Sequence, residues 1–264
     1  MPAPDLPGFA KVWSDDFDGP ASSPPNAQNW TLETPPHNYN NEQQVYTNST
    51  DNAFLNGSGQ LCIAPRKVNG KWTSARMHGN ASFACDNNHK MIFSAHVKVG
   101  QNSPQQQQGI WPAWWTLGQS IQHGTQWPKC CEWDIMELKN GTSRNQGTVH
   151  QTDTSGNHTS SFGFADFSRQ DFHTWSLLVD LTSNDYNQQT LNWQLDGQTY
   201  FTVHGDGSSA ATRECWDRCG RSAFFPILNV AVGGDFVGSP NDGTVEGVES
   251  GLTLQWVAVY KSNT

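Results

Sequence analysis

The sequence predicts an all-β protein, a sandwich or jelly roll of two antiparallel sheets. Lys, Glu and Leu are scarce, whereas Gly, Asn, Ser, Thr and aromatic residues are abundant, which is typical of strands and turns. Strand-like segments separated by turn-rich stretches continue at similar spacing from end to end. We therefore expect residues 1–264 to form a single domain, and one sheet face can curve into an open groove.

The expected strands alternate or are continuously apolar. They are Lys11–Phe17, Gln60–Ala64, Trp72–Met77, Met91–Val99, Ile110–Leu117, Glu132–Leu138, Gly147–His150, Thr174–Asp180, Thr190–Leu195, Thr199–Val203, Phe224–Val232 and Leu252–Tyr260. The clearest hairpin is TLNWQLDGQTYFTV, in which Asp196-Gly197 is a typical two-residue turn. The last strand, LTLQWVAVY, alternates as a strand with one buried face should. No helix is expected.

Charge and hydropathy limit the partners. The formal net charge of -9 argues against nucleic acid or an anionic membrane surface as a partner. The longest apolar stretch, Ala223–Gly234, contains Pro226 and Asn229 and is too short to span a bilayer. A neutral or cationic ligand fits this chain better.

The cysteines and glycosylation sequons indicate secretion. The six cysteines lack the paired C-x-x-C spacing of a zinc site, so disulfides are favoured over buried thiols, and Cys215 and Cys219 could close a small loop. The cysteines are Cys62, Cys85, Cys130, Cys131, Cys215 and Cys219. The Asn-x-Ser/Thr sequons begin at Asn29, Asn48, Asn56, Asn80, Asn140 and Asn157. We expect a secreted, extracellular protein.

The segment KCCEWDIMELKNG carries three acidic residues in an otherwise apolar run. In a helix, Glu132 and Asp134 would point about 200° apart and could not share a site. On a strand, alternation puts Glu132 and Asp134 on one face and Trp133 on the other. Glu137 is one residue out of phase, and it joins the acidic face only if a β-bulge absorbs the extra residue.

Three carboxyl groups on one face suit glycoside hydrolysis. Like charges raise at least one pKa, so the three groups are not all ionised at neutral pH. The reaction needs one ionised carboxylate at the anomeric carbon and one protonated carboxyl for the leaving oxygen. Asp134 would orient Glu132 and keep Glu137 protonated. The alternatives are a solvent-facing strand edge and a calcium site.

Aromatic residues surround the acidic segment. Sugar rings present apolar C–H faces that stack on aromatic planes, so the tryptophans of GIWPAWWTLG suit a saccharide groove. On an alternating strand Trp111 and Trp115 share a face, whereas Trp114 points the other way, so at least one of the three is expected to be ordinary core. Trp127 lies closer to the acids, and His150 in GTVH could reach a sugar hydroxyl from the neighbouring strand.

Together these segments resemble glycoside hydrolase family 16, specifically its laminarinase-like 1,3-β-glucanases. The family signature E-[ILV]-D-x-x-E appears here as EWDIME. The resemblance extends through VWSDDFDG, NYNNEQQVYT, KWTSARM, QQQQGIWPAWWTLG, GTVHQTD, DFHTWSLLVD, LNWQLDGQTY, FFPILNVAVGGDF and LQWVAVYK. It implies a β-jelly roll with a concave substrate cleft and a retaining double-displacement mechanism.

The resemblance also implies the roles of individual residues. Glu132 would be the nucleophile, Asp134 the assisting acid and Glu137 the general acid/base. The substrate-binding residues that it implies are Asn40, Arg76, Trp111, Trp115, Trp127 and His150.

The chain departs from the family pattern at three places. Trp133 replaces a small aliphatic residue and should point into the sandwich interior. Cys130-Cys131 replaces the usual residues before the first Glu. Gln255 stands where many members carry an Asp that binds a structural calcium ion, to which Asp16 could still contribute; no cofactor is required.

We therefore expect a secreted, retaining endo-hydrolase of laminarin-type 1,3-β-glucan. It would act as a monomer on a polysaccharide, without a nucleic-acid or membrane partner. Endo-1,3-β-galactanase and transglycosylase remain alternatives, because groove contacts select the sugar and motifs do not determine them. A non-catalytic glucan-binding protein is the alternative from another class, but such proteins typically lose the catalytic glutamates that this chain keeps.

Overall fold

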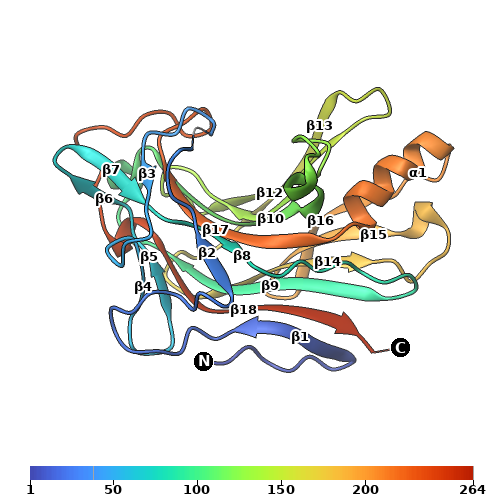
Figure 1. Ribbon diagram of the computed structural model, residues 1–264, viewed down its shortest axis with the longest axis horizontal. Helices are drawn as coiled ribbons and strands as arrows, with labels where there is room; N and C mark the ends of the chain where they lie inside the picture. Colours follow the sequence, from blue (N-terminus) through green and yellow to red (C-terminus); the bar gives the residue numbers. More distant parts are fainter. Residues whose placement is uncertain (38, 264) are drawn as a thin grey trace.

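The computed structural model describes residues 1–37 and 39–263. Two large antiparallel sheets face each other, and a small third sheet lies at one end of the molecule (Figure 1). This arrangement confirms the all-β prediction of two packed antiparallel sheets.

The first sheet has eight strands in the order β16-β15-β14-β9-β18-β5-β4, with β1 paired to β18. Its strands are β1 (Phe9–Asp15), β4 (Ala53–Leu55), β5 (Leu61–Ile63), β9 (Lys90–Val99), β14 (His173–Asp180), β15 (Thr190–Leu195), β16 (Gln198–His204) and β18 (Leu252–Ser262). The β15–β16 hairpin confirms the predicted turn: Asp196 and Gly197 both have positive φ, at 49° and 80°, as this turn type requires.

The second sheet has seven strands in the order β13-β12-β11-β10-β17-β8-β2. They are β2 (Trp30–Leu32), β8 (Arg76–Gly79), β10 (Ile110–Gly118), β11 (Glu132–Glu137), β12 (Arg144–Thr152), β13 (His158–Asp166) and β17 (Phe224–Val232). The third sheet contains β3 (Val45–Tyr46), β6 (Arg66–Val68) and β7 (Lys71–Ser74).

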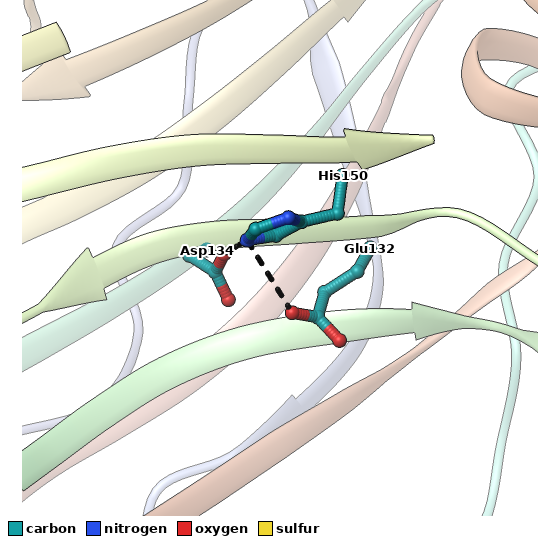
Figure 2. A group of neighbouring side chains, drawn as sticks. All are labelled: Glu132, Asp134 and His150. Carbon is teal, nitrogen blue, oxygen red and sulfur yellow. Dashed lines mark ion pairs between the residues drawn. The ribbon is translucent and has the colours of Figure 1, made fainter. Parts of the chain in front are cut away.

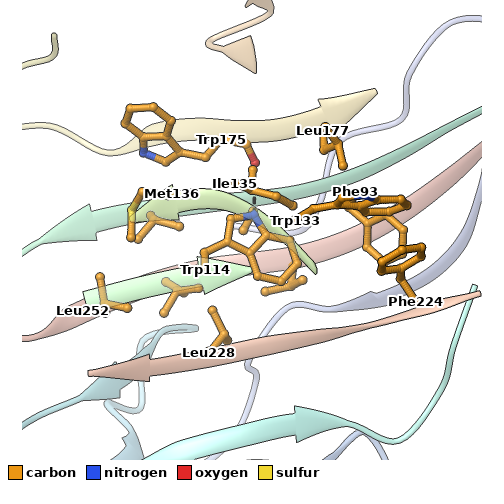
Figure 3. Close-up of a cluster of buried hydrophobic side chains, with 14 of the residues drawn as sticks. Phe93, Trp114, Trp133, Ile135, Met136, Trp175, Leu177, Phe224, Leu228 and Leu252 are labelled. Carbon is orange, nitrogen blue, oxygen red and sulfur yellow. Dashed lines mark hydrogen bonds between the residues drawn. The ribbon is translucent and has the colours of Figure 1, made fainter. Parts of the chain in front are cut away.

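The main core fills the space between the two large sheets. Trp133 is completely buried, stacks on Phe224 with ring centroids 3.5 Å apart and meets Phe93 of the first sheet edge-on (Figure 3). Burying a large apolar side chain contributes about 1.5–3 kcal/mol. Trp114 is also fully buried in this core. The structure therefore confirms the inward position expected for Trp133, and Trp114 is one tryptophan of its segment that is core, as expected.

The strand predicted over 72–77 is wrong as a single element. The chain passes from β7 in the third sheet to β8 in the second, and Ala75 lies between them. The pairing partners explain the break, since β7 pairs with β3 and β6, whereas β8 pairs with β17 and β2.

One short helix contradicts the expectation that the chain has none. Helix α1 (Ala210–Trp216) begins after Ser209, whose side chain accepts a hydrogen bond from the Thr212 backbone N–H. Such N-capping satisfies an otherwise unpaired donor of the first turn. Single turns of other helix types are Pro104–Gln107, Gln119–His123, Tyr186–Gln188, Asp217–Arg221 and Val248–Ser250. Within the described residues, no helix is long and apolar enough to cross a bilayer.

The expected disulfides are not formed in the structure. All six cysteines are free thiols, including Cys215 in α1 and Cys219 in the turn that follows it. Five are buried and Cys215 is half-buried, so buried thiols, the alternative to disulfides, describe most of them. Cys131 and Cys219 are neighbours in the core: a hydrogen bond with the Cys219 thiol, together with burial, raises the pKa of the Cys131 thiol.

Candidate active site

A β-bulge in β11 brings the acidic residues to one face of the second sheet. Trp115 of β10 pairs with Asp134, and Ala113 pairs with Glu137, so the register shifts between these pairs and Ile135 is the extra residue. Because Ala113 and Trp115 are two residues apart on a strand, their partners point the same way. The structure thus confirms the predicted bulge, and we call this outward side of the second sheet the acid face.

Side chains from elsewhere satisfy the backbone groups that the bulge removes from the ladder. The Trp193 indole N–H of β15 donates to the Asp134 carbonyl at 2.7 Å. The Tyr200 hydroxyl of β16 and the Asn145 amide of β12 donate to the Ile135 carbonyl, each at 3.3 Å. Buried backbone carbonyls need such partners, so the first sheet helps to hold the bulge.

Glu132 and Asp134 share a histidine. His150 Nε2 lies 3.4 Å from Asp134 Oδ2 and 4.0 Å from Glu132 Oε1 (Figure 2). The Trp127 indole N–H donates to Glu132 Oε2 at 3.1 Å. His150 and Trp127 therefore lie where the sequence predicted, beside the first two acids.

Glu137 is held by two other groups. The Trp111 indole N–H donates to Glu137 Oε1 at 3.0 Å, and the Glu137 backbone N–H donates to Asn145 Oδ1 at 2.8 Å. Asn145 also donates to the bulge, so this one buried amide fixes both the strand irregularity and the acid that follows it.

Burial and mutual repulsion favour the protonated forms of the three acids. Burial and then the Asp134 charge raise the pKa of Glu132 to about 8, although His150, Arg76 and Trp127 oppose the rise. Burial raises the pKa of Asp134 to about 7. Burial, followed by the charges of Asp134 and Glu132, raises the pKa of Glu137 well above its ordinary value. The group therefore retains protons at neutral pH, as the sequence predicted.

Trp115 is a largely buried aromatic residue that pairs with Asp134 across the strands. Its indole N–H donates to Asn229 Oδ1 at 2.7 Å, which fixes the ring. The Arg76 guanidinium lies 4.8 Å from the Trp115 ring and 4.4 Å from the Tyr39 ring. Cations over aromatic faces are stabilised by the ring quadrupole. Arg76 and Trp115 thus come together at this face, as predicted.

Arg76 is itself held by an acid that the sequence did not single out. Glu33 lies 3.2 Å from the Arg76 guanidinium and 3.1 Å from His78 Nε2. Burial opposes ionisation of Glu33, but the hydrogen bond with His78 and the Arg76 charge outweigh it and lower its pKa. Glu33 follows β2, which pairs with β8, so only the strand pairing brings it to Arg76.

Asn40 lies at the margin of the group. Its carbonyl accepts a hydrogen bond from the Asp235 N–H at 2.9 Å. Gly234, the residue before Asp235, lies against both this carbonyl and the Trp111 ring. The Asn40 residue is exposed and adopts a positive φ of 48°. Its backbone therefore shapes the rim beside Trp111, and substrate binding by its side chain stays a prediction.

His158, which the sequence analysis missed, joins the site from β13. Its Nε2 lies 2.9 Å from His150 Nδ1, and its ring centroid lies 4.9 Å from that of Trp127. The signal that could have found it is the alternation of HTSSFGFAD, in which His158 begins a strand.

A structural calcium ion, to which Asp16 could contribute, stays a prediction. The Asp16 carboxylate accepts a hydrogen bond from the Ala3 N–H at 2.8 Å. In residues 1–37 and 39–263, the only acidic and histidine side chains grouped closely enough to share one ion are Glu132, Asp134 and His150. These lie on the acid face, where carboxylates and histidine serve glycoside chemistry equally well.

Comparisons with known proteins agree with this geometry, although no protein-family model matches the chain. It is 31% identical to a glucan endo-1,3-β-glucosidase from Cryptopygus antarcticus over 249 residues, which cover 86% of this chain and 81% of that protein. The endo-1,3-β-glucanase structure from Streptomyces sioyaensis is 30% identical, with a TM-score of 0.86 and full coverage of both chains.

A third relative, the laminarinase from Rhodothermus marinus, is 25% identical, with a TM-score of 0.76 and coverage of 98% of this chain and 100% of that one. The shared fold, the similarity over nearly the whole chain and the acid face agree with one another. The chain belongs to the laminarinase-type endo-1,3-β-glucanases of glycoside hydrolase family 16.

Proposed function

We propose that this glycoside hydrolase cleaves laminarin-type 1,3-β-glucan internally, with retention of anomeric configuration. The observation that carries the proposal is the bulge, which puts a third carboxyl group on the same face as the first two. Retention needs two carboxyl groups in different protonation states on either side of the scissile bond. The acid face supplies three, each with its own partners.

The partners support one assignment of roles. Glu132 has a histidine, an arginine charge and an indole N–H that favour its ionised form. Glu137 feels the charges of both other acids, and its pKa is raised well above the ordinary range. Glu137 is thus the better proton donor and Glu132 the better nucleophile. The carboxyl of Asp134 lies 3.4 Å from His150, and its charge raises the pKa of both glutamates, which couples their titrations.

The reaction then proceeds in two displacements. Glu132 attacks the anomeric carbon while Glu137 gives its proton to the leaving glycosidic oxygen, which yields a glycosyl-enzyme ester and a shortened chain. Glu137, now ionised, takes a proton from water, whose oxygen displaces Glu132 and releases the sugar with its original configuration. The indole N–H of Trp127 stabilises the Glu132 carboxylate each time it leaves.

Substitution of the two glutamates tests the mechanism directly. In Glu137→Ala, laminarin hydrolysis should fall roughly 10²- to 10⁴-fold, and Glu132→Ala should lose at least as much because no ester can form. Added azide should then give a glycosyl azide of inverted configuration with Glu132→Ala and of retained configuration with Glu137→Ala, which NMR distinguishes.

Wild-type products provide the matching control. NMR during early laminarin cleavage should show β-configured reducing ends, with α-ends arising only by later mutarotation. Lichenan and β-1,3-galactan, assayed in parallel, test the sugar preference. Initial α-products, or full activity in Glu132→Ala, would refute the retaining mechanism. Faster cleavage of galactan than of laminarin would refute the substrate.

We also propose that the enzyme is secreted, because its substrate class is polymeric and the chain carries six sequons. Asn48 is exposed, whereas Asn140 donates to the Val237 carbonyl and accepts from the Gly109 N–H. Asn48 is therefore the better glycan acceptor. Enzyme from the culture medium of its native host should shift in mass after amide-linked glycans are removed, and Asn48→Gln should reduce the shift. Confinement of the protein to cells would contradict secretion.

A further inference from the structure

Two phenylalanines are exposed side by side on β13, the edge strand of the second sheet. Phe162 retains 54% and Phe164 43% of its accessible surface. Their rings meet edge to face, with centroids 5.5 Å apart. Single exposed apolar residues need no explanation, whereas contiguous exposed apolar patches mark ligand-binding or interaction sites.

Glycines on the opposite side of the hairpin explain why these rings point outward. A Cβ at Gly163 would lie 2.5 Å from the Phe201 Cβ of β16, and one at Gly147 would lie 2.6 Å from the Trp193 ring of β15. These paired glycines let β12 and β13 pack closely against the first sheet. The alternate residues of β13, both phenylalanines included, therefore face away from the core.

The strand register places the pair on the acid face. Asp134 pairs with Thr148 of β12, and Thr148 pairs with Phe162 of β13. Directly paired residues project to the same side of a sheet, so Phe162 lies about 10 Å, two strand spacings, from Asp134. Phe164 pairs with Gln146, the next outward residue of β12. The rings thus continue the row of the catalytic acids to the sheet edge.

The same strand already reaches the site at its other end. His158, which points outward like the two phenylalanines, contacts His150 and Trp127. Those residues in turn contact Glu132. The outward side of β13 is therefore continuous with the residues around the nucleophile, and it is not a separate patch on the far side of the molecule.

We propose that Phe162 and Phe164 form a sugar-stacking platform, the β13 platform, that binds the 1,3-β-glucan chain beyond the catalytic acids. The inference rests on the proposed function, because the occupant is the same polysaccharide. The apolar C–H faces of glucose rings suit the two exposed phenyl rings. The Arg144 guanidinium, 4.7 Å from the Phe164 ring, and Asp166, 3.6 Å from Arg144, supply polar groups for hydroxyls at the rim.

Binding to the inactive Glu132→Ala protein tests the platform without catalysis. Calorimetry would compare linear laminaritriose with laminarihexaose in this background, with and without Phe162→Thr/Phe164→Thr; threonine keeps strand propensity. The double substitution should weaken hexaose binding about five- to tenfold, as expected for lost aromatic contacts, and should weaken triose binding less. Phe162→Tyr/Phe164→Tyr should retain hexaose binding.

The control is Val68→Thr, which removes a similarly exposed apolar side chain from β6, in the third sheet. Equal hexaose affinity with and without the phenylalanines would overturn the platform, as would an equal loss for both sugars. So would a wild-type dimer, detected by sedimentation, that dissociates on the double substitution while glucan affinity stays constant. Tight binding of laminarihexaose by a wild-type protein that does not cleave it would refute the proposed function alone.

Discussion

The pKa values of two largely buried carboxyl groups beside the second sheet, those of Glu33 and Glu132, shift in opposite directions. The Glu33 side chain is 12% exposed and that of Glu132 is 15% exposed. Glu33 has Arg76 and His78 within hydrogen-bonding distance, and its pKa is lowered. Glu132 has an acid as its nearest charged neighbour on the strand, and its pKa is raised to about 8. Burial raises the pKa of both carboxyl groups; at Glu33 the neighbouring His78 and Arg76 outweigh it, whereas at Glu132 the Asp134 charge adds to it.

The opposite pKa shifts suit the two carboxyl groups to different roles. An acid that stays ionised can hold a cation permanently, and Glu33 holds Arg76 over the Trp115 ring. An acid that gains and loses a proton within the working pH range can instead transfer it to a substrate. Removing the charge of Glu33 and removing that of Glu132 should therefore change the stability of the protein in opposite directions.

The largest effect should come from removing the central charge of the acid face. In Asp134→Asn, kcat/KM on laminarin should fall roughly 10- to 100-fold, because the carboxylate that lies 3.4 Å from His150 Nε2 loses its charge. The Asp134 charge raises the pKa of both Glu132 and Glu137, so its removal lowers both. Both limbs of the pH profile of kcat/KM should then move to lower pH.

The matched control for this charge removal is Asp171→Asn. Asp171 is exposed in the turn before β14 of the first sheet, so the substitution removes the same charge without touching the acids. Its pH profile should match that of the wild-type protein. If the pH profile of kcat/KM did not move in Asp134→Asn, the electrostatic coupling of the three acids would be contradicted.

Stability should show a smaller contrast with opposite signs. The pKa of Glu132 is raised on folding, so the wild-type protein loses stability as pH rises from the unfolded value towards about 8. Glu132→Gln should remove that loss and raise the free energy of unfolding by about 1–2 kcal/mol at about pH 8, with little effect at about pH 4.

Glu33→Gln should do the reverse. The pKa of Glu33 is lowered on folding, so its stabilising contribution is present above the unfolded value and is lost as pH falls through the folded one. This variant should lose about 1–2 kcal/mol at about pH 8 and less at about pH 4. Urea unfolding at both pH values measures each pair. A lower free energy of unfolding in both variants at about pH 8 would contradict the distinction between Glu33 and Glu132.

Local patterns predicted the central part of the site well. The alternation of EWDIME gave the faces of Glu132, Asp134 and Trp133, and the extra residue before Glu137 required the bulge that β11 contains. The Asp196-Gly197 turn was predicted on the same basis. These features depend on neighbouring residues along one strand, so their physical causes are present in the local sequence.

Features that depend on pairing between distant segments could not be predicted. Glu33 meets Arg76 only because β2 pairs with β8. β13 is an edge strand that the sequence analysis did not identify, although its pairing with β12 extends over nine residues. Cysteine count and sequons suggested disulfides, yet cross-linking depends on distances in the fold, which composition does not encode.

The indole of Trp193 and the hydroxyl of Tyr200 reach across the core to the carbonyls of the bulge. The spacing of Glu132, Asp134 and Glu137 is thus set partly by a sheet that carries none of them. A substitution at Trp193 or Tyr200 would remove a partner of the bulge and disturb this spacing from the other sheet. The first sheet therefore shapes the acid face from behind, through the side chains that hold the β11 bulge.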